Sequence, residues 1–144
     1  MAVLDAVIAG NTFDQQPAVD GDTVVVTIGG STQSDLGIPV QAYYPDTGEW
    51  STGLIPDIDS SIGDLGSTDD LTRASGGRVG DYLVVAGGFL SNTLTDRIFV
   101  FDTTNLSGSW TELTSTLPAI RAESSYATDD QYLYMFGGVN DAGP

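Results

Sequence analysis

The 144-residue chain contains no cysteine, no histidine and no lysine. Without cysteine, disulfides and thiolate chemistry are excluded. Zinc and the transition metals favour imidazole and thiolate ligands, so sites for these metals are hard to build from this composition. Catalytic Ser-His-Asp and Cys-His arrangements are excluded for the same reason.

Positive charge is also scarce. The chain has twenty acidic residues and four basic ones, which gives a formal net charge of −16. All four basic residues are arginines: Arg73, Arg78, Arg97 and Arg121. Such a surface repels phosphate groups, so neither nucleic acid nor an anionic membrane is an expected partner. Two explanations of the acidic composition stay open: a solvated surface kept soluble by self-repulsion, or adaptation to high salt, which screens that repulsion.

Long apolar runs are missing as well. No run approaches the ~20 residues that span a bilayer, so membrane insertion is not expected. Residues 1–10 lack the basic start and long apolar middle of a secretory signal. The compartment stays open, with an extracellular or surface-exposed location slightly favoured. The length and the hydrophobic content of 40% suit a single globular domain.

What the chain does have is a recurring glycine pair. Three β-rich apolar runs end in one: residues 23–28 before Gly29 and Gly30, residues 82–86 before Gly87 and Gly88, and residues 132–136 before Gly137 and Gly138. The pairs start at 29, 87 and 137, so the intervals are 58 and 50 residues. After the first two pairs come an aromatic strand and a tryptophan, Trp50 or Trp110. A period of about 50 residues with four short strands is typical of a kelch propeller blade.

Over residues 15–138 the chain resembles the kelch family. Arg73 and Arg121 are placed at the family's arginine position, and Phe101-Asp102 matches its Tyr-Asp position. In Tyr44-Pro45-Asp46 the proline and aspartate are transposed relative to the family pattern. The resemblance implies an all-β fold of four-stranded antiparallel blades without substantial helix. It also implies that the arginines tie neighbouring blades together and that the tryptophans pack between blades.

The repeat predicts one partial propeller domain over residues 1–144. Blade one spans about 15–54, blade two about 72–117, and half a blade 120–144, with an aspartate-rich insert at 53–72. Propellers close with four to eight blades, so this ring is incomplete within one chain. Either the chain is a fragment, or copies complete a ring, and two chains would supply five or six blades.

The N-terminal stretch has no counterpart in the repeat. Residues 2–9 are strand-like, and residues 1–10 are predicted as an extra N-terminal strand. It would add an outer strand to an incomplete blade by β-augmentation, or form a frayed extension or an extra strand of blade one.

The insert suggests a cation site. Asp57, Asp59 and Asp64 lie among glycines and serines, and Ca²⁺ takes six to eight oxygen ligands from flexible loops. The spacing lacks the full EF-hand pattern, and a solvated loop is the alternative. No other cofactor is predicted. Insertions in repeat proteins often form the binding face, so the insert is also a candidate contact region.

Carboxylate chemistry is the remaining catalytic option. Glu123 lies two residues after Arg121 and would act as a general acid or base in a central channel, as in some sugar-modifying kelch enzymes. The structural alternative is a tie between blades. The copper oxidases built on kelch propellers need histidine ligands and a cross-linked cysteine, so their activity is excluded.

The leading hypothesis is a non-enzymatic module for protein binding or self-assembly, acting through blade edges and loops. Its partner would be another protein or a copy of itself, as a homo-oligomer. The alternatives are a structural component of a cell surface or virion, and a fragment of a sugar isomerase or lyase-like enzyme.

Overall fold

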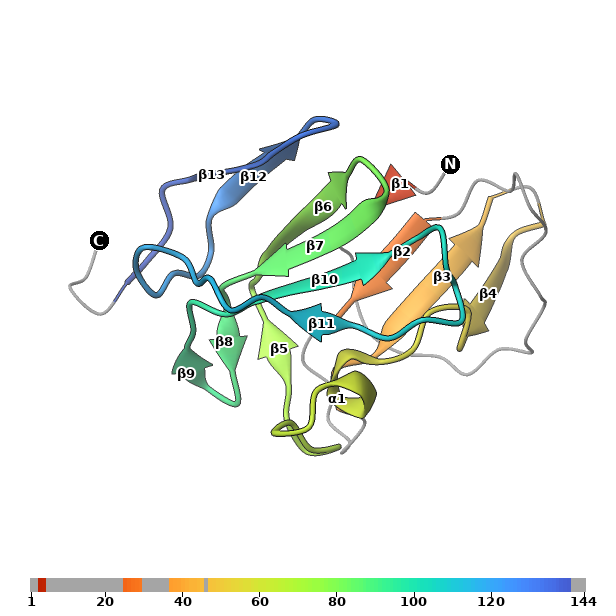
Figure 1. Ribbon diagram of the computed structural model, residues 1–144, viewed down its shortest axis with the longest axis horizontal. Helices are drawn as coiled ribbons and strands as arrows, with labels where there is room; N and C mark the ends of the chain where they lie inside the picture. The colour runs from red at the N-terminus through yellow and green to blue at the C-terminus, as the bar shows by residue number, and fades with distance from the viewer. Residues whose placement is uncertain (1–2, 5–24, 30–36, 46, 141–144) are drawn as a thin grey trace.

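A computed structural model describes residues 3–4, 25–29, 37–45 and 47–140. Within these ranges the chain is nearly all β, with short, mostly antiparallel sheets and one single-turn helix, α1 (Ile58–Ser61). Figure 1 shows the sheets following one another across the molecule. The all-β fold class is confirmed.

Blade one is a four-stranded sheet in the order β1-β2-β3-β4. Its strands are β1 (Val3–Leu4), β2 (Val25–Ile28), β3 (Val40–Tyr44) and β4 (Glu49–Thr52). β2, β3 and β4 are antiparallel, whereas β1 runs parallel to β2 with Val3 opposite Val25. At Val3–Leu4, therefore, the N-terminal segment pairs at the inner side of blade one, next to β6, and not at an outer edge. The remainder of residues 1–10 lies outside the described residues.

Blade two is a complete antiparallel sheet in the order β11-β10-β7-β6. Its strands are β6 (Ser75–Val79), β7 (Tyr82–Ala86), β10 (Ile98–Asp102) and β11 (Thr111–Glu112). Leu83 and Val85 are buried on one face of β7, opposite the buried Phe101 and Phe99 of β10. Complete burial of one such aromatic side chain contributes on the order of 3 kcal/mol.

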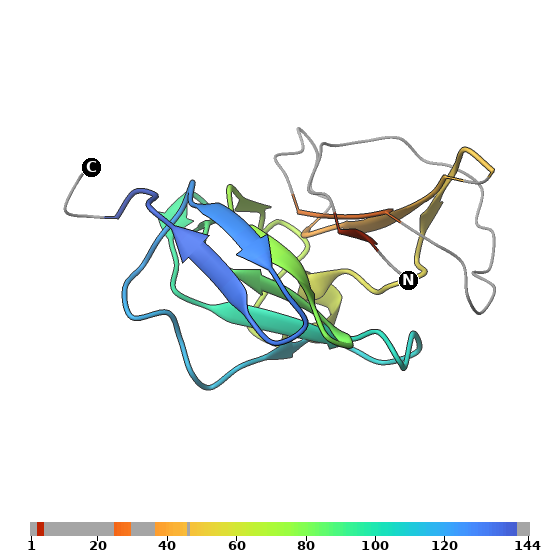
Figure 2. The same ribbon diagram turned by 90° about the horizontal axis from the view of Figure 1, so that it is seen from above.

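Blade three is a two-stranded sheet in the described residues. β12 (Ser125–Thr128) and β13 (Leu133–Phe136) are antiparallel, with Ser125 opposite Phe136. The hairpin packs against β6, and Figure 2 shows it beside blade two on the side away from blade one. Thr128 lies so close to Gly77 of β6 that a Cβ at Gly77 would collide with it.

A small sheet below the blades was not predicted from the sequence. It pairs β5 (Leu71–Thr72), β8 (Phe89–Leu90) and β9 (Thr93–Leu94). Ser91 and Asn92, which join β8 to β9, have φ values of 47° and 65°. Two successive residues with positive φ make the type I′ turn that suits a tight hairpin.

The main core lies between blades one and two, and the insert contributes to it. Ile55, Ile58 and Ile62 of the insert are buried in the same cluster as Val40 and Leu83. The expectation that residues 53–72 form a solvated loop is therefore wrong for these apolar side chains. Every third or fourth residue of the segment points inward, which fixes its path between the two blades.

The structure also corrects the position of one arginine. Glu123 follows Arg73 by 50 residues, and Gly137 follows Gly87 by the same interval. Arg73 and Glu123 each lie two residues before an inner strand, and their φ values are 55° and 57°. Glu123, not Arg121, therefore takes the position of Arg73 in blade three. Arg73 and Arg121, which share an Arg-Ala dipeptide, are therefore offset from each other by two residues and are not equivalent.

Candidate protein-interaction surface

The first glycine of each pair lies at a joint between blades. Gly29 and Gly87 both have positive φ, 68° and 65°. A Cβ at Gly29 would collide with the carbonyl oxygen of Leu71, and one at Gly87 with that of Arg121. Leu71 and Arg121 both belong to the segment that leads into the following blade. Glycine is required because it allows the backbone of the next blade to approach.

The second glycine packs within its own blade. A Cβ at Gly88 would lie 2.7 Å from the carbonyl oxygen of Thr72, and one at Gly138 would lie 2.5 Å from that of Ala122. The N–H of Gly88 also donates to the carbonyl of Arg121 in the next blade, at 2.7 Å. Gly30, the second glycine of the first pair, lies outside the described residues.

Gly137 has the same backbone conformation as the other first glycines but no close neighbour. Its φ is 65°, and a Cβ placed on it would meet no described atom within 4 Å. Likewise, no carbonyl in the part of the chain that the structure describes accepts from the N–H of Gly138. The blade-to-blade joint is thus formed at Gly29 and Gly87 and open at Gly137.

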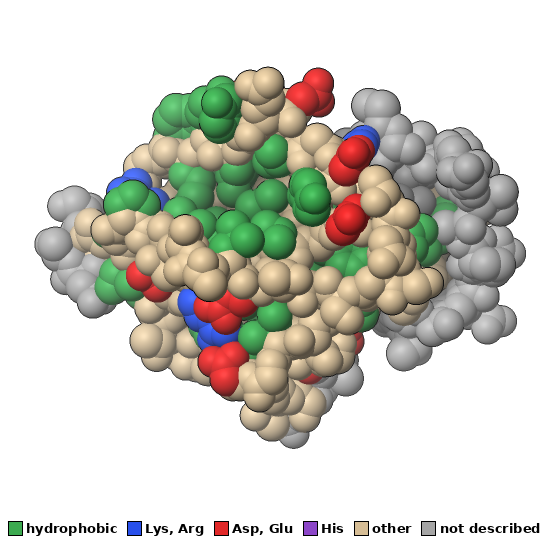
Figure 3. Space-filling model, viewed as in Figure 1, with side chains coloured by type: hydrophobic (Ala, Val, Ile, Leu, Met, Phe, Trp, Pro, Cys, Tyr) green, Lys and Arg blue, Asp and Glu red, His purple; other side chains and the backbone are tan. Residues whose placement is uncertain are grey.

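Side chains beside this open joint are exposed where their counterparts are buried. Phe136 directly precedes Gly137 and is 59% exposed, whereas Ala86 directly precedes Gly87 and is 2% exposed. Tyr134, three residues before Gly137, is 43% exposed, whereas Val26, three residues before Gly29, is fully buried. We call Tyr132, Tyr134, Phe136 and Gly137 the blade-three face. Figure 3 shows hydrophobic side chains gathered over the β12–β13 hairpin.

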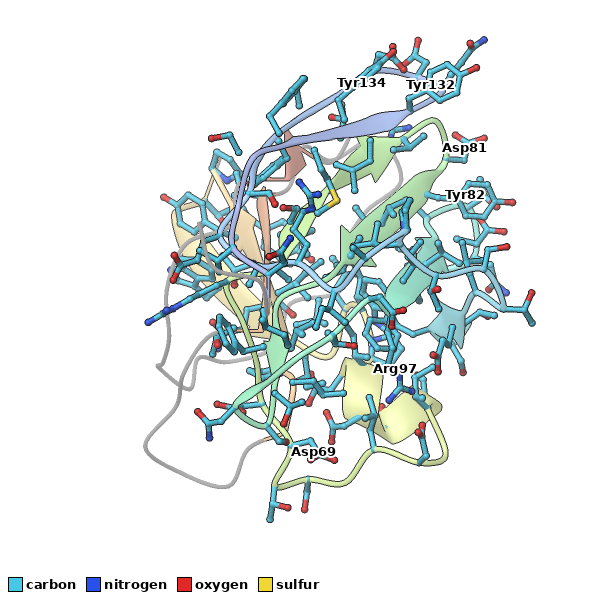
Figure 4. All side chains as sticks on the ribbon, turned by 90° about the vertical axis from the view of Figure 1, so that its left-hand side faces the viewer. Asp69, Asp81, Tyr82, Arg97, Tyr132 and Tyr134 are labelled. Carbon is cyan, nitrogen blue, oxygen red and sulfur yellow. The ribbon has the colours of Figure 1, made fainter. Side chains whose placement is uncertain are left out.

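Asp129 orients the outer end of this face. Its carboxylate accepts the N–H groups of Gln131 and Tyr132, both at 2.7 Å, and the hydroxyl of Tyr134 at 2.9 Å. These bonds, led by that from Gln131, lower the pKa of Asp129, and the same carboxylate raises the pKa of Tyr134. The rings of Tyr132 and Tyr134 lie 5.9 Å apart, and both project from the hairpin in Figure 4. Asp129 therefore anchors the backbone of Tyr132 and the hydroxyl of Tyr134.

Blades two and three are tied together by Arg73 and Glu123. The guanidinium of Arg73 is ion-paired with the carboxylate of Glu123, and the N–H of Glu123 donates to the carbonyl of Arg73 at 3.0 Å. Arg121 instead donates to the carbonyl of Gly137 in its own blade, at 2.5 Å. The structure thus gives Glu123 and Arg121 separate partners and does not bring them together as a catalytic pair.

Two of the predicted calcium ligands hold the start of β3. Asp57 accepts the N–H of Val40 at 2.9 Å, and Asp59 accepts that of Ile38 at 2.8 Å. Partial burial raises the pKa of Asp57, the bond from Val40 opposes this rise, and the nearby charge of Asp59 adds to it. The carboxylate of Asp59 also covers Gly37, where a Cβ would collide with it.

Asp64, the third predicted ligand, is bound to an arginine. Arg97 donates to Asp64 at 2.8 Å and to both oxygens of Glu112, and its guanidinium lies 5.2 Å from the ring centre of Phe99. The hydrogen bond from Arg97 lowers the pKa of Asp64. In the described residues no three acidic side chains converge on a cation site. Calcium binding stays a prediction, and it would require these carboxylates to leave their present partners.

The two tryptophans that the repeat predicts to be equivalent, Trp50 and Trp110, make similar ring contacts. Trp50 lies 5.1 Å from Tyr43, and Trp110 lies 5.5 Å from Phe101, with interplanar angles of 44° and 43°. Trp110 is buried and donates through Nε1 to the carbonyl of Pro56 in the insert, at 2.7 Å. Trp110 therefore packs blade two against the exit segment of blade one.

Comparison with known proteins agrees with the repeat. Residues 71–116 match the Kelch motif. This match spans blade two together with the small β5-β8-β9 sheet, and it confirms the kelch resemblance for that unit. No curated protein matches the chain. In the described ranges, no helix has the length and apolar character needed to cross a membrane.

Kelch repeats generally form non-enzymatic interaction scaffolds. The sequence located the three glycine pairs, one of them inside the matched unit, but not the blade-three face. One signal was present: β13 carries Tyr134 and Phe136 where the equivalent strands carry Val26 and Ala86.

Proposed function

We propose that this chain is a non-enzymatic protein-binding module that uses the blade-three face as its contact surface. The observation that carries the proposal is the open joint at Gly137, where Phe136 is 59% exposed and the equivalent Ala86 is 2% exposed. An exposed apolar surface of neighbouring side chains is the kind that marks protein contact sites.

The chemistry of the face suits the backbone of another protein. At the two formed joints, the glycine accommodates a backbone carbonyl of an incoming extended segment, as at Leu71 and Arg121. At Gly137 the same space, together with the N–H of Gly138, which no described carbonyl accepts, supports docking of an extended segment with a small side chain. Tyr134 and Phe136 would supply the apolar contact around it.

A labelled peptide provides a direct test. The peptide copies residues 119–128, the segment that covers Gly87 in this chain, and its fluorescence anisotropy is measured with the intact protein. We expect saturable binding that falls at least tenfold in Phe136→Arg. Leu106→Arg adds the same charge at an exposed apolar residue outside the blade-three face and should bind as the unaltered chain does. No saturable binding, or equal binding to Phe136→Arg, would overturn the proposal.

Two hypotheses from the sequence, a cell-surface or virion component and a sugar-modifying enzyme fragment, stay predictions. No residue contact described above favours either.

A further inference from the structure

This inference rests on the proposed function and names the partner of the same surface. We propose that the blade-three face binds blade one of a second copy of this chain, so that copies associate head to tail. The proposal comes from comparing the two faces that meet between blades one and two with the faces at the two ends of the molecule.

The contact between blades one and two shows which side chains form a joint between blades. Blade one presents Val26 and Ala42 on one face, and both are buried. Blade two presents Phe101 and Trp110, also buried, on the face that packs there. We call the first a trailing face and the second a leading face.

The blade-three face is the trailing face of the last sheet. Tyr134 occupies the position of Val26, three residues before the first glycine. In the joint between blades one and two, the trailing position is covered by a leading face that carries an aromatic pair. The repeat therefore indicates that a blade bearing such a pair fits over Tyr134 and Phe136.

Blade one carries that pair on its own leading face. Tyr43 lies opposite Val25, four residues before Gly29, just as Phe101 lies opposite Leu83, four residues before Gly87. Tyr43 and Trp50 are both half-buried, whereas Trp110 is 2% exposed. Among the described residues, the trailing face of blade three and the aromatic leading face of blade one thus lie at opposite ends of the series of sheets. A head-to-tail contact between two different faces either closes a ring or continues as a filament.

The net charge predicts how the association of copies depends on salt concentration. Each chain carries a formal charge of −16, so two copies repel at low ionic strength. The Debye length falls from about 10 Å at 0.1 M salt to about 3 Å at 1 M, which removes most of this repulsion while leaving apolar contact intact. Association should therefore increase with salt, the reverse of an assembly held by ion pairs.

Sedimentation and light scattering of the intact chain test this at 0.1 M and 2 M NaCl. We expect the mass to rise from 15.0 kDa at low salt to multiples of it at high salt. Gly137→Ala, Phe136→Arg and Gln41→Glu should each hold the protein at 15.0 kDa in 2 M NaCl, with unchanged circular dichroism. Gln41 lies on the same face of β3 as Tyr43, and Leu106→Arg serves as the charge control.

Mixing two variants distinguishes head-to-tail contact from other association. Phe136→Arg keeps an intact leading face, and Gln41→Glu keeps an intact trailing face, so an equimolar mixture should form dimers through one interface. A mixture that stays monomeric while the unaltered chain associates would overturn the proposal. So would a 15.0 kDa mass at every salt concentration. If the peptide of residues 119–128 still binds in that case, the proposed function stands and the partner is a different protein.

Discussion

Arg73 and Glu123 occupy the same position in successive blades and are joined both by an ion pair and by a backbone hydrogen bond. Both residues have φ near 56° in the left-handed region, at 55° and 57°. Left-handed backbone costs a non-glycine residue roughly 1–2 kcal/mol. The contact between the two residues thus spans the joint between blades two and three. It stabilises a left-handed backbone conformation that is unfavourable for both residues.

Removing the ion pair alone should have a small effect. The side chains are 61% and 43% exposed, and exposed ion pairs contribute up to about 1 kcal/mol. We expect Glu123→Gln to lower the free energy of urea unfolding by less than about 1 kcal/mol, and 1 M NaCl to abolish the difference. The exchange Arg73→Glu with Glu123→Arg should restore the loss. A large loss that persists in 1 M NaCl would show that the carboxylate has another role.

Replacing each of two equivalent glycines with alanine should lower the stability of the protein by different amounts. Both Gly87 and Gly137 have φ of 65°, so each substitution carries the same backbone strain of about 1 kcal/mol. Gly87→Ala would also push a Cβ into the carbonyl of Arg121, whereas Gly137→Ala meets no described atom. At low salt, we therefore expect Gly87→Ala to destabilise the protein several times more. Equal losses in chemical denaturation would contradict the joint at Gly87.

Trp110→Phe should show how much the hydrogen bond between blade two and the insert contributes to stability. The change keeps an aromatic ring against Phe101 but leaves the carbonyl of Pro56 without its donor. The bond is partly buried, and a hydrogen bond contributes about 0.5–1.5 kcal/mol, so we expect a loss of unfolding free energy in that range. Trp50→Phe, at a half-buried position, is the matched control and should lose less.

Two aspartates of the insert should show opposite dependence on pH. Burial raises the pKa of Asp57, so its neutral form is favoured in the folded state, and its contribution to stability is lost as pH rises through the folded pKa. Arg97 lowers the pKa of Asp64, so its contribution is present above the unfolded value of about 3.9 and is lost as pH falls through the folded pKa.

Thermal unfolding at pH 3 and pH 7 tests the two signs. Relative to the unaltered chain, Asp57→Asn should be more stable at pH 7, since amide oxygen still accepts from Val40. Asp64→Asn should be less stable at pH 7, and its difference should vanish at pH 3. Shifts of the same sign in both variants would contradict these assignments.

The repeat was predictable because glycine pairs, tyrosines and tryptophans recur at fixed positions along the chain. Residues 82–86 form β7 as predicted, and the strand predicted at 132–136 begins one residue later, at Leu133. Local patterns of this kind depend on a strand having one buried face. They fail where a side chain's partner lies far away in sequence, as for Asp64 and Arg97.

The register of Arg121 shows how such a pattern misleads. Arg73-Ala74 and Arg121-Ala122 are identical dipeptides, yet backbone conformation aligns Arg73 with Glu123. Counting back from the glycine pair aligns Arg73 with Glu123, because 14 positions separate Arg73 from Gly87 and Glu123 from Gly137. The β8–β9 hairpin was missed because its strands are two residues each, and Ser91-Asn92 lacks the glycine expected of a type I′ turn.

The buried isoleucines of the insert limit how this protein can be redesigned. A repeat protein can be redesigned by trimming its unequal units to one length and joining them. Here the residues that make unit one longer supply Ile55, Ile58 and Ile62 to the main core and the carbonyl that receives Trp110. Trimming the chain to a uniform 50-residue module would therefore remove three buried side chains from the core between its first two sheets.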